Sequence, residues 1–146
     1  MKLIAIETSS CICSVALNLD GDIFSSEKTA LQGHASHVLP LVSELLHNRG
    51  TQLKDLDAVA YGRGPGSFTG VRVSCAVTQG IALALDLPVI GISSLAAMAQ
   101  VVNSPCIVAM LDARMGDVYC AEFRKTAQGI LQLLGEERMD KPERLK

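Results

Sequence analysis

The residues best suited to chemistry are two acids, each placed at the end of an apolar run. Glu7 follows "LIAI" and Asp112 follows "VAML", and in both cases a short polar turn and a second apolar run come next. The segments that begin at Leu3 and Val108 therefore share one plan, as a duplicated unit would. Carboxylates so placed can hold Mg²⁺ beside a nucleotide. A chance likeness between two hairpins is the alternative, and two acids without a base or phosphate loop do not make an ATPase.

A glycine-rich stretch, "YGRGPGSFTGVR" from Tyr61 to Arg72, is the second candidate. Its spacing matches neither a Walker A motif nor a GxGxxG fingerprint. We favour a tight turn that sets the direction of the next helix, with Ser67 or Thr69 as its cap. The alternative is a loop whose exposed amides hold an anion. The residues that would contact an anion or nucleotide are Glu7, Gly64, Gly66, Ser67, Thr69, Arg72 and Asp112, and Arg63 and Arg114 could also reach phosphate.

Metal and thiol chemistry have little support in the sequence. His34 and His37 stand at HxxH spacing, but no third or fourth ligand is visible, so no metal site is predicted. The five cysteines are odd in number and include no CxxC, which indicates reduced and mostly buried thiols. No serine lies in a GxSxG motif and no HExxH occurs, so a peptidase is the weakest class of function.

The hydrophobic pattern predicts the elements that must position these residues. Three strands at 2–8, 12–19 and 22–30 form an antiparallel meander, with a two-residue hairpin at "LDGD". The remaining predicted elements are an amphipathic helix at 36–48, a strand at 56–62, an apolar helix at 70–86, a strand at 87–93 and a helix at 94–103. Together with the repeated unit that begins at Leu3 and Val108, this order indicates an α/β fold of the ribonuclease-H-like, actin-like ATPase type. We expect a complete N-terminal lobe at 1–103 and the opening strands of a second lobe at 104–146.

The apolar helix carries a stripe of small residues, because Ala76, Gly80 and Ala84 follow one another at i+4 steps. Another helix can approach such a stripe closely. We therefore expect the two long helices to lie side by side on the sheet and to leave an apolar ridge for a partner protein. The predicted interface residues are Val38, Leu41, Val42, Leu45, Val73, Ala76, Val77, Gly80, Ile81 and Ala84.

Composition narrows the class of function. The net charge is −2 and aromatic residues make up 3% of the chain, so the chain lacks the basic and aromatic surface of a lone nucleic-acid binder. No apolar run approaches the roughly 18 residues that span a bilayer, and the first residues are too few for a signal peptide. We expect a cytoplasmic protein without a membrane segment, for which any RNA would be bound by a partner.

Six segments, read in order, resemble the TsaB (YeaZ) family over almost the whole chain. They are "IETS", "HASHVLPLVSELL", "YGRGPGSFTGVR", "QGIALAL", "GISSLAAMA" and "LDARMGDVY". The resemblance implies an actin-like fold and a non-catalytic dimerisation subunit. Such a subunit binds and activates its paralogue TsaD, which works with the ATPase TsaE to place the threonylcarbamoyl group on the tRNA adenosine beside the anticodon. It further implies contact with tRNA only through the complex, a homodimer when alone, and an interface on 36–48 and 69–86.

Two other functions stay open beside that resemblance. The strand-and-acid repeat suits an ATP-binding or ATP-hydrolysing domain, with ATP or ADP and Mg²⁺ as the cofactor. A peptidase acting on the paralogue is the third class, since relatives of this family have carried that label. Members of the family continue through a full second lobe, whereas this chain ends soon after that lobe's first strands. A complete nucleotide cleft is therefore not predicted.

Overall fold

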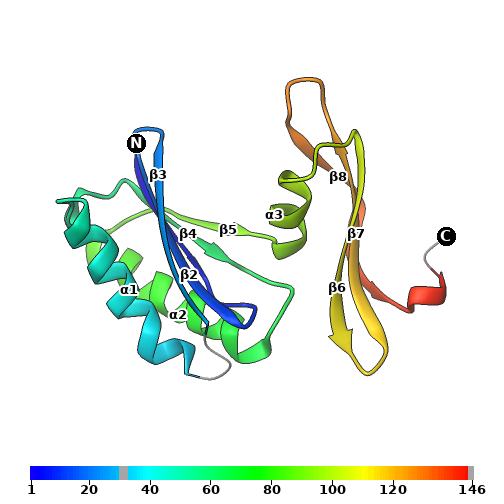
Figure 1. Ribbon diagram of the computed structural model, residues 1–146, viewed down its shortest axis with the longest axis horizontal. Coiled ribbons are helices and arrows are strands. Elements are labelled where there is room, and N and C mark those ends of the chain that lie inside the picture. The colour runs from blue at the N-terminus through cyan, green and yellow to red at the C-terminus, as the bar shows by residue number, and fades with distance from the viewer. Residues whose placement is uncertain (30–32, 145–146) are drawn as a thin grey trace. The chain divides into compact units, whose positions relative to one another are not determined.

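The computed structural model describes residues 1–29 and 33–144, and the chain forms two compact units (Figure 1). The first unit contains Met1–Arg63 and Ser67–Ile92, and the second contains Gly64–Gly66 and the chain from Ser93 onward. Each unit has its own sheet and its own buried core.

A five-stranded sheet with the order β3-β2-β1-β4-β5 forms the centre of the first unit. Its first three strands, β1 (Lys2–Glu7), β2 (Ile12–Leu19) and β3 (Asp22–Thr29), are antiparallel neighbours. The other two, β4 (Ala58–Gly62) and β5 (Val89–Ile92), run parallel to β1 and to each other. The predicted α/β class and the predicted meander are therefore confirmed.

The hairpin between β2 and β3 has the two-residue turn that "LDGD" predicts. Leu19 pairs with Asp22, so Asp20 and Gly21 alone make the connection. Both have positive φ, 55° and 113°, the backbone region in which aspartate and glycine are favoured at such turns. This turn fixes the register, which places alternate residues of β2 against the core.

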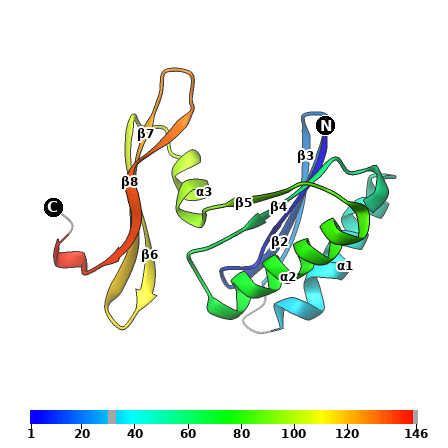
Figure 2. The same cartoon turned by 180° about the vertical axis from the view of Figure 1, so that it is seen from behind.

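Two long helices cover one face of this sheet (Figures 1 and 2). They are α1 (His34–Asn48) and α2 (Phe68–Leu85), and a short 3-10 helix at Leu53–Asp55 follows α1. The core between helices and sheet consists of apolar residues at alternate strand positions and at helical spacing. Its buried members are Ile4, Ile6, Cys13, Val15, Leu17, Val38, Leu41, Val42, Leu45, Leu46, Leu56, Val59 and Ile81.

α2 is a longer apolar segment than expected, because no apolar run of membrane-spanning length is predicted from the sequence. By length and composition alone, its 18 residues, with a mean hydropathy of 1.4, could cross a membrane. The core helix of a globular domain passes the same test, but such a helix is mostly buried, whereas only 28% of α2 is buried. α2 packs against β4 and β1, and buried hydroxyl groups lie on the side that faces them. Its contacts are thus those of a helix on a sheet.

The second unit is a three-stranded antiparallel sheet with one helix on it. Its strands are β6 (Cys106–Arg114), β7 (Asp117–Lys125) and β8 (Leu131–Asp140), and α3 (Ser94–Gln100) covers one face. The expected boundary after residue 103 lies too late, because Leu95 and Ala99 of α3 are fully buried against this second sheet. β8 is not among the strands predicted from the sequence.

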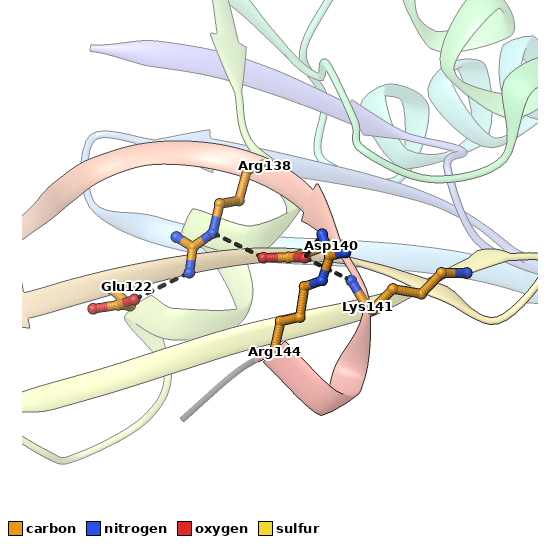
Figure 3. Close-up of polar contacts among 5 residues, drawn as sticks. All are labelled: Glu122, Arg138, Asp140, Lys141 and Arg144. Atoms are coloured by element: carbon orange, nitrogen blue, oxygen red, sulfur yellow. Dashed lines mark hydrogen bonds and ion pairs between the residues drawn. The ribbon is translucent and has the colours of Figure 1, made fainter.

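Ion pairs on the outside of the second unit join the end of β8 to its neighbours (Figure 3). Arg138 lies 3.4 Å from Glu122 on β7 and 3.8 Å from Asp140, and Arg144 lies 3.9 Å from Asp140. Lys141 pairs with Asp117 at 2.7 Å. All these cations are substantially exposed, so the pairs position the strand end and contribute little stability.

Candidate functional site

An open apolar groove between α1 and α2 is the main candidate site. It has a volume of about 500 Å³ and almost no polar lining. Its walls are formed by Leu39, Leu53, Ala76, Val77, Gly80, Ile81, Ala84 and Leu85. Ala76, Gly80 and Ala84 are exposed, and a methyl group at Gly80 would meet nothing within 4 Å. The small-residue stripe therefore forms an accessible floor that a partner helix can approach closely.

The structure corrects half of the predicted interface. Val38, Leu41, Val42 and Leu45 are between 0% and 7% exposed and belong to the core, so a partner cannot reach them. Their i, i+3, i+4, i+7 spacing is the stripe that packs α1 onto its own sheet. Ile81 is also buried, at 8% exposure.

Leu39 is the α1 residue that faces the groove, and sequence reasoning missed it. Its side chain is 53% exposed, although Val38, directly before it in the same helix, is buried. The only sign in the sequence that Leu39 faces a groove is that this large apolar residue lies outside the buried stripe of α1. Val73 and Val77 remain partly exposed on α2, and Val77 lines the groove as predicted.

A second stripe of small residues runs along the opposite side of α2. Gly70, Ser74, Thr78 and Ala82 follow one another at i+4 steps and are all buried. Ser74 Oγ donates a hydrogen bond to the Gly62 carbonyl oxygen at 2.9 Å, whereas Thr78 Oγ1 has no partner among the described residues. α2 thus has one small-residue stripe against the sheet and another toward the groove. Only the outer stripe is among the features predicted from the sequence.

The glycine-rich loop packs against the turn between β1 and β2. A Cβ at Gly62 would lie 1.8 Å from Glu7 Oε2, and a Cβ at Gly70 would lie 1.8 Å from the Thr8 carbonyl oxygen. Gly70 therefore requires glycine, because the backbone of Thr8 cannot move aside, whereas a Cβ at Gly62 would only displace the end of the flexible Glu7 side chain. The Ser67 hydroxyl accepts a bond from the Gly70 N–H, as the predicted cap, and the Ser67 N–H donates to Ser9 at 2.6 Å. These contacts support the structural interpretation of the loop.

The two predicted carboxylates have the same local role in their separate units. Glu7 Oε1 accepts a hydrogen bond from the Ser9 N–H at 2.5 Å, and Asp112 Oδ1 accepts one from the Arg114 N–H at 2.7 Å. Each acid therefore closes the turn after the first strand of a three-stranded antiparallel meander. This repetition supports the duplicated plan inferred from the sequence.

The residues proposed for anion contact are only partly brought together. Glu7 and Ser67 are connected through Ser9, but an anion at this point would face the Glu7 carboxylate, which repels it. Arg72 is exposed and its guanidinium carbon lies 3.2 Å from the Phe68 ring centroid. Thr69 is exposed in the first turn of α2. Gly64, Gly66 and Asp112 belong to the second unit.

Histidine and cysteine side chains show no catalytic geometry in the described part of the chain. His34 is buried and its Nδ1 has no hydrogen-bond partner there, so no carboxylate orients the ring through that atom as it would in a triad. Across residues 1–29 and 33–144, no group of three or more histidine, cysteine or acidic side chains could hold a metal ion. Cys11 is an exposed free thiol, and burial raises the pKa of the Cys13 thiol, which disfavours its reactive thiolate form.

Comparison with known sequences identifies a family and close relatives. The family model described as "TsaD: tRNA N6-adenosine threonylcarbamoyltransferase" matches residues 24–146. "tRNA threonylcarbamoyladenosine biosynthesis protein TsaB" of Escherichia coli K12 is 43% identical over 98% of this chain, and its counterpart in Haemophilus influenzae is 45% identical over 84%. The chain spans 64% and 53% of the length of these two relatives.

Comparison with solved structures agrees. "YeaZ from Pseudomonas aeruginosa" has 41% identity and a TM-score of 0.93, and the match covers 99% of this chain and 70% of that one. A second Pseudomonas structure, described as an uncharacterized protein with similarity to peptidase YEAZ, gives the same identity and TM-score over 68% of its length. The ribonuclease-H-like, actin-like class predicted from the sequence is thereby confirmed.

Proposed function

Because this chain belongs to the TsaB (YeaZ) family, we propose that it is a non-catalytic cytoplasmic subunit of the machinery that makes threonylcarbamoyladenosine in tRNA. Its role is to bind and activate the paralogue TsaD, which carries out the transfer. The observation that supports this role is the groove along α2, whose exposed small residues suit a helix of another protein.

The chemistry of the groove explains why a protein is the preferred ligand. Its lining offers apolar surface and almost no hydrogen-bonding groups, so binding there depends on burying that surface. Without TsaD, a second copy of the chain can occupy the same groove as a homodimer. TsaE joins the complex as its ATPase, and tRNA contacts this subunit only through the complex, since the chain has a net charge of −2.

A charge-insertion pair on α2 tests this proposal. Ala76→Glu puts a carboxylate on the groove floor, where a docked partner would bury it without a counter-charge. We expect affinity for purified TsaD, measured by calorimetry on the full chain, to fall by several kcal/mol. The matched control is Gln128→Glu, which adds the same charge to an exposed position in the turn between β7 and β8, outside the groove, and should bind normally. Normal binding by Ala76→Glu would contradict the proposal.

Nucleotide binding is the second candidate, and the matching positions of Glu7 and Asp112 are what favour it. Within its own unit, each acid could serve as a ligand of Mg²⁺ with ATP or ADP, but it supplies no base for hydrolysis. Calorimetry with ATP and Mg²⁺ tests this candidate, and the absence of heat at millimolar nucleotide would remove it.

A further inference from the structure

The outer edge of β5 presents backbone groups that no strand of the described chain pairs. β5 is the last strand in its sheet. The carbonyl oxygens of Pro88 and Ile92 accept hydrogen bonds from Val59 and Arg63, on the β4 side, at 3.0 and 2.9 Å. Because successive strand residues direct these groups to opposite sides, Val89 and Gly91 direct their N–H and C=O groups away from β4. The edge therefore offers two donors and two acceptors in the spacing of a β-strand.

A pocket lies beside this edge, between β5 and α2. Its volume is about 380 Å³, and it is lined by Tyr61, Cys75, Thr78, Gln79, Ala82, Leu83, Leu87 and Val89. Leu83 is 82% exposed and Val89 is 46% exposed, so apolar surface surrounds the opening. The Tyr61 ring covers Gly91, where a Cβ would lie 3.3 Å from Tyr61 Cε1. This pocket shares no lining residue with the α1–α2 groove.

We propose that β5 and this pocket together bind an extended peptide segment of a partner protein. The segment adds to the sheet as a sixth strand next to β5, and one of its aliphatic side chains enters the pocket. In this mode of recognition the main-chain hydrogen bonds supply affinity and the side-chain pocket supplies selectivity. Both parts are present, and they lie next to each other on one edge of the sheet.

The size of the site favours an extended segment over a second copy of the chain. A stable interface between globular partners buries about 1,200–2,000 Å². β5 has four residues, and only Val89 and Gly91 direct backbone groups outward, so the edge itself is too short to hold two globular chains together. An extended segment requires no more than this row of groups and one anchoring side chain. The inference does not depend on the proposed role of the α1–α2 groove.

A synthetic probe tests the site on the ¹⁵N-labelled full chain. The probe is a capped heptapeptide of alternating threonine and leucine with a lysine at each end. At millimolar peptide we expect shifts of the Val89, Gly91 and Thr78 amide resonances, and slower hydrogen exchange at Val89 and Gly91. The absence of shifts there, or shifts confined to Leu39, Gly80 and Ala84 in the other groove, would overturn the proposal.

Two pairs of variants separate strand addition from unspecific contact. Val89→Pro removes one outward N–H and should abolish the shifts, whereas Val89→Thr keeps the N–H and should retain them. Leu83→Asp changes the rim of the pocket at an exposed position and should weaken binding by about tenfold or more. Ile23→Asp, at an exposed apolar residue of β3 that lines neither pocket, should leave it unchanged. Equal binding by Leu83→Asp and Ile23→Asp would overturn the role of the pocket, even if Val89→Pro failed to fold.

Discussion

At the scale of single residues, Gly70 and Gly80 of α2 differ in the space that surrounds them. A methyl group at Gly70 would overlap the Thr8 carbonyl oxygen, while one at Gly80 would enter open solvent. We expect Gly70→Ala to lower the free energy of unfolding by about 3 kcal/mol or more, because backbone cannot move aside easily. Gly80→Ala should raise it by about 0.5–1 kcal/mol, since alanine is the better helix former. Urea unfolding of both variants checks this, and equal effects would contradict it.

Two buried hydroxyl groups on the inner stripe of α2 provide a second comparison. Ser74 Oγ donates to the Gly62 carbonyl oxygen, and Thr78 Oγ1 has no partner in the described chain. Thr78→Val should therefore stabilise the fold by about 1 kcal/mol, because it removes an unsatisfied polar atom. Ser74→Ala should destabilise it by a similar amount, because the Gly62 carbonyl loses its donor. Thermal unfolding shows whether each variant is more or less stable than the unchanged protein. A loss of stability in Thr78→Val would indicate a water bound to the Thr78 hydroxyl.

At the scale of elements, α1 shows which of its leucines belong to the core. Leu45→Ala should cost about 2–5 kcal/mol of unfolding free energy, because it leaves a cavity under the helix. Leu39→Ala removes an exposed side chain and should change stability by less than about 0.5 kcal/mol. Only Leu39→Ala should weaken binding to TsaD. Chemical unfolding measures the stability of both variants, and calorimetry measures their affinity for TsaD. A loss of stability in Leu39→Ala would show that Leu39 belongs to the core.

At the scale of the whole molecule, the two units should differ in local stability. The core of the first unit joins five strands to two long helices, whereas that of the second joins three strands to the short α3. Less buried apolar area means that less free energy opposes local opening. We expect amides of β6, β7 and β8 to exchange faster than those of β1, β2 and β4. Hydrogen exchange measured by NMR tests this, and equal protection would show one cooperative core.

The strands and helices of the fold could be predicted from the sequence more accurately than the set of residues that lie on the accessible surface. The "LDGD" turn, the apolar runs of β1 and β2 and the helical spacing in α1 all contain enough local information, because period and turn chemistry are local properties. Val38 and Leu45 were assigned to an interface because periodicity identifies an apolar stripe but not the surface that covers it. α3 was placed with the wrong sheet for the same reason. β8 has no strict alternation of buried and exposed residues, so its pairing with β7 depends on tertiary contacts.

The contact between Gly70 and Thr8 also has a mechanical consequence. Since no methyl group fits between the first turn of α2 and the turn that Glu7 closes, the helix cannot slide along its axis without displacing that turn. The hydrogen bonds from Thr8 Oγ1 to Gly70 and from Ser67 to Ser9 reinforce this connection. We therefore expect any movement of α2, such as one that accompanies docking of a partner, to be accompanied by movement of the acid at the end of β1.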